Sequence, residues 1–321
     1  MKIEVEHIDE AEFEEWLISP GGVRCKELID EVSAIIERQT VDSDSVSIVI
    51  TGRFNESVES RSPGGPGEAY DNERLAGLAA AKTMPRPDGS IDVVIPGVFF
   101  VGLDDESPSA ITLRTQLLIY LAEHEAQHVG MGQRGESLTS SAHEFAGGMS
   151  ATRFTTSAAI VADEYRAELA AVTRRGVDQP YWKSVPESLG SIKPALLDAL
   201  KIRYPGESME RPMSTAYLAA HETWVTLAYL AAHTKVDGDI QDVPHELSSS
   251  NAWRRYVGTH WGAFGEILNS LPPGNSACDR DVLKGRVIEL SELFRLWFNT
   301  FGFDLRDTGS GMYFDVLRHD F

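Results

Sequence analysis

The chain has 321 residues, 42% of them hydrophobic, so it can bury a sizeable core as one large domain or two smaller ones. Its formal net charge of −20 argues against binding nucleic acid or an anionic membrane through a basic surface. The two cysteines form no thiol-ligand pattern, the start is acidic, and no apolar run reaches transmembrane length, so we expect a cytoplasmic protein.

The first hundred residues read as a mixture of helix and strand. Two acidic helices are expected at 8–18 and 23–39, and the alternation in 46–50 predicts a strand. Glycine, proline and serine in 57–69 predict a flexible loop. Residues 91–101 read as a strand broken at Pro96-Gly97, which suits an edge strand or, as an alternative, a buried central strand followed by a turn.

A helix is predicted to begin after Ser107. This serine is a good N-cap, Pro108 suits the first turn, and Gly130 stands where a C-cap glycine would end the helix. Between them, one helical face is expected to be buried and to be continued by two histidines. Its members are Leu113, Leu117, Leu121, His124 and His128.

The most informative residues in this helix are His124-Glu125-Ala126-Gln127-His128, an HExxH motif. Positions four apart lie on the same face of a helix, so both imidazoles can reach one metal ion. Glu125 is placed to contact a water at the open position of that metal. Because the motif lies inside a predicted helix, it indicates a metal centre rather than two ordinary core histidines.

A metal centre of this kind needs a third protein ligand, and the best candidate lies on the next predicted helix. Thr156 or Ser157 can cap that helix and Gly176 can end it, after a connection over 130–157 that is either a lid or a plain surface loop. Glu164 and Glu168 lie four apart on a partly apolar face, where carboxylates are costly to bury without a positive partner.

Other third ligands stay open at this point. His143 and Glu144 lie in a predicted loop 15 residues past His128, and Glu136 and Asp163 are also available. Glu164 itself can be read as a solvated acid on an exposed face, although the alanines around it favour close packing.

The second half is expected to be mainly helical, over 191–203, 214–233, 251–269 and 280–300. The second of these helices carries a row of aromatic and imidazole side chains at four-residue spacing. The row consists of Tyr217, His221, Tyr229 and His233, and it drifts around the helix, so all four cannot face one site.

HExxH on one helix, with Glu164-Tyr165-Arg166-Ala167-Glu168 on the next, resembles the gluzincin metallopeptidases and in particular the minimal bacterial forms. The resemblance covers 107–176. It implies that His124, His128 and Glu164 bind zinc and that Glu125 is the general base. Glu168 would hydrogen-bond a ligand imidazole, although the family usually has Asp at that position.

The resemblance also implies a fold. We expect an α+β, mainly helical chain with a zincin-like core, in which a small mixed or antiparallel sheet lies over the HExxH helix. A metal-binding region over 1–176 would be followed by a helical region over 177–321, either as two regions or as one continuous domain. The segment 91–101 would pair with an extended substrate by strand addition. Gluzincins commonly supply a distant His or Tyr for the oxyanion, and His221 or Tyr217 is our candidate, with Tyr229 and His233 behind them.

The function expected from these residues is a zinc-dependent peptidase acting on a narrow intracellular peptide or protein substrate. Two histidines and one carboxylate also describe a non-haem iron oxygenase that uses Fe²⁺ and 2-oxoglutarate to modify a peptide or small molecule. A third reading is a non-catalytic interaction protein that is stabilised by its metal and docks a basic partner.

Overall fold

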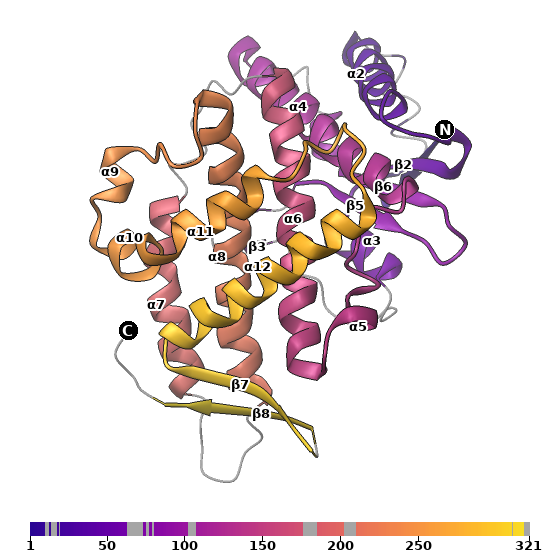
Figure 1. Cartoon of the computed structure of the whole chain (residues 1–321). Helices are drawn as coiled ribbons and strands as arrows, with labels where there is room; N and C mark the ends of the chain where they lie inside the picture. Colours follow the sequence, from indigo (N-terminus) through magenta and orange to yellow (C-terminus); the bar gives the residue numbers. More distant parts are fainter. Residues whose placement is uncertain are drawn as a thin grey trace. The chain divides into compact units, whose positions relative to one another are not determined.

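A computed structural model describes residues 1–9, 13, 18, 20–62, 73–74, 77–78, 80–101, 107–175, 185–201, 210–309 and 311–317 (Figure 1). The fold is α+β and mainly helical, as expected. The chain forms two compact units. The N-terminal unit comprises residues 1–74 and 78–134, and the helical unit comprises 75–77 and 135–321. This division falls at residue 135 rather than at the expected 176, so the second motif helix belongs to the helical unit.

Strands and helices are interspersed between residues 1 and 134. They are β1 (Lys2–Glu6), α2 (Pro20–Glu37), β2 (Val46–Thr51), α3 (Phe54–Arg61), β3 (Glu73–Arg74), β4 (Gly77–Leu78), β5 (Lys82–Pro85), β6 (Ile91–Pro96) and α4 (Pro108–Gln133). Short 3₁₀ turns lie at Ser43–Ser45 and Gly97–Phe99.

The helical unit begins with a short helix and ends in a β-hairpin. Its elements are α5 (Ala142–Phe145), α6 (Met149–Arg175), α7 (Val185–Lys201), α8 (Glu210–Asp237), α9 (His245–Ser248), α10 (Asn251–Tyr256), α11 (Gly258–Asn269), α12 (Arg280–Thr300), β7 (Phe303–Thr308) and β8 (Gly311–Val316). None of the helices in the described part of the chain is both long and apolar enough to cross a membrane.

The N-terminal unit is built on a mixed sheet with strand order β1-β2-β6-β5. Strands β1, β2 and β6 are parallel, and β5 pairs antiparallel with β6. The strand expected at 46–50 is therefore confirmed. The expectation of an edge strand at 91–101 is wrong and its alternative holds, because β6 lies between β2 and β5 and a 3₁₀ turn follows Pro96. Within the described residues, β5 lies at this edge of the sheet.

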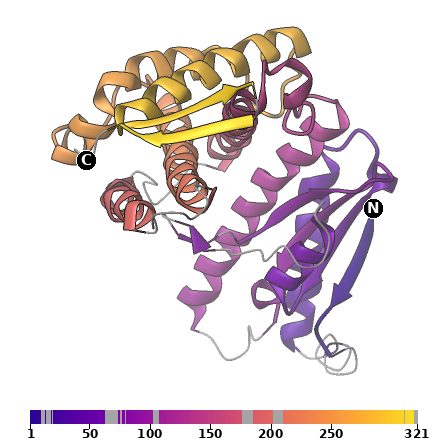
Figure 2. The ribbon, with the colours of Figure 1, turned by 90° about the horizontal axis from the view of Figure 1, so that it is seen from below.

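Alternating side chains of the sheet enter two separate apolar clusters. Ile48 and Val93 belong to the cluster that includes α2 and α4, whereas Val49, Val94 and Met84 pack with α3. This alternation is the period of a strand, and both faces are apolar because helices cover both. Figure 2 shows the long helix α4 running beside the sheet, and α4 contacts β5.

Helix α4 begins as predicted but ends later. Ser107 accepts a hydrogen bond from the amide of Ala110, and Pro108 opens the first turn. Gly130 does not end the helix, which continues to Gln133; Gly135, with φ +69°, follows the C-cap residue Arg134. Gly130 is instead required by packing, because a Cβ there would lie 2.7 Å from the carbonyl oxygen of Gln39.

The buried face of α4 also differs from the predicted one. Leu113 and Leu117 are 58% and 44% exposed, so the row leading to the histidines is not a core stripe along its length. The side chains that enter the core of this unit are Leu118, Ile119, Ala122, Ala126 and Val129. Of the predicted row only His124 is buried, and Leu121 and His128 are partly buried.

Helix α6 begins at Met149, seven residues before the expected cap at Thr156, and Ser157 is buried inside it. The expected loop 130–157 is accordingly helical at both ends and contains α5. The N-terminus of α6 is capped from far along the chain, because Asp307 of β7 accepts hydrogen bonds from the amide and hydroxyl of Ser150 at 2.8 Å each.

The core of the helical unit is aromatic and lies between α6, α8, α11 and α12. Trp224 contacts Phe264, Phe294 and Trp297, and Phe154 of α6 contacts Phe294. Edge-to-face and offset contacts of this kind stabilise a core beyond simple area burial.

The remaining expectations for the second half are largely confirmed. The helix expected at 280–300 has these bounds, and the one expected at 251–269 is divided at Val257 into α10 and α11. The hairpin of β7 and β8 was not predicted. The loop expected at 57–69 is helical over 57–61, which belong to α3, and its residues 63–69 lie outside the described part of the chain. Most of the helix expected at 8–18 and the expected terminator Gly176 also lie outside the described residues.

Candidate metal centre

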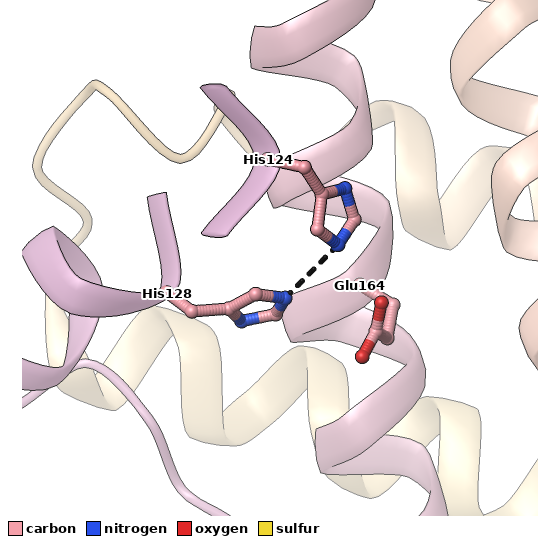
Figure 3. A group of neighbouring side chains, drawn as sticks. All are labelled: His124, His128 and Glu164. Carbon is pink, nitrogen blue, oxygen red and sulfur yellow. Dashed lines mark hydrogen bonds between the residues drawn. The ribbon is translucent and has the colours of Figure 1, made fainter. Parts of the chain in front are cut away.

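The two motif histidines approach each other closely on α4. His124 Nε2 and His128 Nε2 are 3.2 Å apart, as the dashed line in Figure 3 marks. Two nitrogens bound to one tetrahedral zinc at about 2.05 Å would be separated by about 3.3 Å. The imidazole pair is therefore already spaced as two ligands of a single metal ion.

Neighbouring groups restrict the side chains of this helix. His124 is 8% exposed and Glu125 7%, so neither extends freely into solvent. The imidazole rings meet edge to face, with centroids 5.0 Å apart. At most one Nε2 of the pair can donate to the other, whereas a metal would accept electron pairs from both.

Glu125 is held from the sheet. The Thr83 hydroxyl lies 2.7 Å from Glu125 Oε2 and 3.2 Å from the Glu125 carbonyl oxygen. Thr83 belongs to β5, the edge strand that contacts α4. The carboxylate predicted as general base is thus tied to the strand beside its helix. No feature of the sequence singled out Thr83, because residues 82–85 were not recognised as a strand.

In the helical unit, two side chains of α6 form hydrogen bonds with two side chains of α8. Tyr229 donates a hydrogen bond to Glu164 Oε2 at 2.5 Å, and His233 Nε2 lies 2.8 Å from Glu168 Oε1. The carboxylates are four apart on α6 and their partners are four apart on α8, so each pair occupies one turn of each helix. The later carboxylate on α6 meets the later partner on α8, as expected for two helices that run in the same direction.

These contacts clarify the roles of the α8 row. Tyr229 and His233, predicted only as reserve residues, are the ones that meet the two carboxylates. Glu168 therefore has a partner on α8, and its predicted bond to a ligand imidazole stays a prediction. Such bonds orient carboxylates and raise the precision of a metal site.

Tyr217, one of the two residues expected to stabilise the oxyanion, occupies a structural position instead. Its hydroxyl bonds the Ser157 hydroxyl at 2.6 Å and donates to the Arg153 carbonyl, and its ring packs on Phe154. Arg153 is eleven residues before Glu164 on the same helix, about 16 Å along the axis. Burial raises the pKa of Tyr217 above its usual range, as suits a neutral hydroxyl in a core.

His221, the other oxyanion candidate, lies eight positions before Tyr229 on α8, which is about 12 Å along the helix axis. Its side chain is partly buried. It does not share a turn with the two α8 residues that contact the carboxylates, so its predicted catalytic role gains no support.

The alternative third ligands are engaged elsewhere or exposed. Glu136 forms a 2.6 Å ion pair with the fully buried Arg166 and accepts from the amide of Cys278. Asp163 accepts a hydrogen bond from the Ser137 hydroxyl at 2.8 Å. His143 and Glu144 lie exposed on the short helix α5 rather than in a loop.

Among the described residues, His124, His128 and Glu164 form one group of potential metal ligands (Figure 3). Each offers one ligand atom, and the three atoms lie within 4.8 Å of one another. Two neutral imidazoles and a carboxylate are a donor set that suits zinc. The residues that the sequence predicted as ligands are thus of the types that bind the ion.

Comparison with known proteins adds no further constraint to this site. No protein-family model matches the chain, and no curated protein and no solved structure was found to match it. The gluzincin resemblance therefore stays a prediction that rests on the residues themselves.

Proposed function

We propose that this protein is a zinc-dependent peptidase whose metal is held by His124, His128 and Glu164. The observation that carries the proposal is the 3.2 Å separation of the two Nε2 atoms, with a carboxylate oxygen available in the same group of ligand atoms. Two further features support it. Tyr229 engages one oxygen of Glu164, which leaves the other suited to a metal, and Glu125 adjoins the first ligand.

The chemistry follows from these positions. Zinc bound there would lower the pKa of water at its open position towards roughly 7 and polarise the substrate carbonyl. Glu125 would take the proton of that water and later deliver it to the leaving amine. Tyr229 would keep the Glu164 carboxylate oriented, while His233 would do the same for Glu168.

The substrate would lie along β5 rather than along 91–101. Among the strands of the described residues β5 lies at the edge beside α4, and an extended peptide binds such an edge by main-chain hydrogen bonds. β6 is unsuited to this task because it is paired on both sides. A peptide on β5 would be held next to Glu125 through the strand that carries Thr83.

The first test is elemental analysis of the full chain purified without added metal, followed by incubation with a mixed-sequence peptide pool read by mass spectrometry. The expected result is about one zinc per chain and new peptide termini. Cleavage should disappear in Glu125→Gln while the zinc content stays.

The same experiment discriminates against the other readings. Iron in place of zinc, with 2-oxoglutarate consumed in air, would replace the peptidase with an oxygenase. Zinc at full occupancy without any cleaved peptide would favour a metal-stabilised interaction protein. Cleavage that survives in Glu125→Gln would contradict the assigned base.

A further inference from the structure

Thr83 occupies a position where the sheet edge and the proposed base meet. It pairs with Val93 in the antiparallel β5–β6 ladder. The Arg86 amide donates to the Ser90 carbonyl at 2.8 Å, which closes the turn between the two strands. Hydrogen-bonded and non-hydrogen-bonded pairs alternate along an antiparallel ladder. Counting back from Arg86, Met84 and Lys82 bond to β6, and the main chain of Thr83 faces away from it.

The side chain of Thr83 points to the face of the sheet that carries α4. Its neighbour Met84 enters the cluster around α3, so Thr83 projects to the opposite face. There its hydroxyl donates to Glu125 Oε2 at 2.7 Å, the usual length of an O–H···O hydrogen bond. The side chain is partly buried, and Glu125 is 7% exposed.

The main chain and the side chain of Thr83 therefore face two different partners. Its main-chain N–H and C=O lie on the edge where an extended peptide would add, and its hydroxyl holds the carboxylate that would act on that peptide. We infer that Thr83 is a positioning residue for Glu125, which fixes the base in register with a substrate strand on β5. The inference rests on the proposed peptidase function.

The physical reason is rotamer restriction. A glutamate side chain has three rotatable bonds, and fixing it costs conformational entropy in each encounter unless it is already ordered. The Thr83 hydroxyl donates its one proton to the Glu125 carboxylate at 2.7 Å, with the carbonyl of the same residue 3.2 Å away, so it orders Glu125 before substrate arrives. Removing the hydroxyl should reduce turnover, while the main-chain contacts that bind the peptide remain.

The test compares Thr83→Val, which keeps the shape and loses the hydroxyl, with Thr83→Ser, which keeps the hydroxyl. The matched control is Thr112→Val on the exposed part of α4, where the hydroxyl bonds only the Pro108 carbonyl of its own helix. For a peptide cleaved by wild type in the mixed pool, Thr83→Val should lower kcat about tenfold with KM changed less than about twofold. Thr83→Ser should restore most of kcat, and Thr112→Val should match wild type.

A second readout does not depend on activity. In crystals of the metal-free variants, the Glu125 carboxylate should leave its position in Thr83→Val and keep it in Thr83→Ser. An unmoved carboxylate with unchanged kcat in Thr83→Val would overturn the inference, as would a loss expressed only in KM. If wild type cleaves no peptide, the proposed function fails, while the crystallographic comparison still decides whether Thr83 orders Glu125.

Discussion

Helices α4 and α6 each present two candidate functional side chains at a spacing of four residues, but these side chains are ordered in different ways. On α4 the two imidazoles meet each other, and the spacing of the helix itself sets their 3.2 Å separation. On α6 each carboxylate is met by a side chain of α8. The histidine pair is therefore a local device, whereas the carboxylates depend on the packing of a second helix.

The proposed base differs again, because its support comes from a strand. Glu125 is on α4, and the hydroxyl that bonds it belongs to β5. Substitutions at these positions should therefore have different effects: loss of hydrolysis, loss of bound metal, or loss of side-chain orientation.

The largest effect is expected for Glu125→Gln, which keeps the size of the side chain and removes its basicity. Peptide hydrolysis should fall about a thousandfold, the middle of the roughly 10²–10⁴ that general acid–base catalysis contributes. Zinc content, measured by elemental analysis, should equal that of wild type because Glu125 is not a ligand. A parallel loss of zinc would mean that Glu125 holds the metal.

Loss of the carboxylate ligand should weaken the metal rather than only the chemistry. We expect Glu164→Ala to reduce zinc affinity more than about a hundredfold, since it would remove a proposed direct ligand, whereas bonds that only orient ligands contribute roughly 10–100-fold. Competition with a chromophoric chelator measures the affinity. The exposed His143→Ala is the matched control, and it should bind zinc like wild type. If His143→Ala lowered zinc affinity more than Glu164→Ala, the third ligand would be His143 of α5.

The bond from α8 should have an intermediate effect. Tyr229→Phe removes the hydroxyl that meets Glu164 and should lower zinc affinity about tenfold, at the lower end for a bond that orients a ligand. Tyr313→Phe removes an exposed hydroxyl from β8 and serves as control in the same competition assay. Equal affinities in both variants would show that α6 needs no help from α8 in orienting its carboxylate.

The smallest effect concerns the cap of α6. Burial opposes ionisation of Asp307, but hydrogen bonds from Ser150 and neighbouring amides outweigh it, so its pKa is lowered below the usual 3.8. A group with a lowered pKa stabilises the fold above its unfolded value and ceases to do so as pH falls through its folded value.

Asp307→Ala should therefore cost about 1 kcal/mol of the free energy of unfolding at neutral pH. The difference from wild type, measured by urea unfolding, should shrink below about pH 3.8. Asp304→Ala on the same strand, where the carboxylate pairs only with Arg306 at 3.3 Å, is the control. A difference that persists unchanged in acid would exclude the charge of Asp307 as its source.

The elements that the sequence predicted well are those whose signals are local. Ser107 and Pro108 mark the start of α4, and the bounds 280–300 of α12 follow from a helical period that begins after the capping residue Asp279. The spacing of His124 and His128 is fixed once the segment is helical. For the same reason the position of Glu125 beside the first histidine needs no tertiary information.

What the tertiary structure decided lies between segments that are far apart in the chain. The start of α6 moved to Met149 because Asp307, 157 residues beyond Ser150, caps it. Gly130 proved to be a packing contact with Gln39 rather than a helix end, and Thr83 reached Glu125 across 42 residues. Tyr229 rather than Tyr217 bonds Glu164 because of the way α8 packs against α6. The period of a helix is set by hydrogen bonds between residues four apart. The residue pairs named above come into contact only when the chain has folded, so no local sequence pattern predicts them.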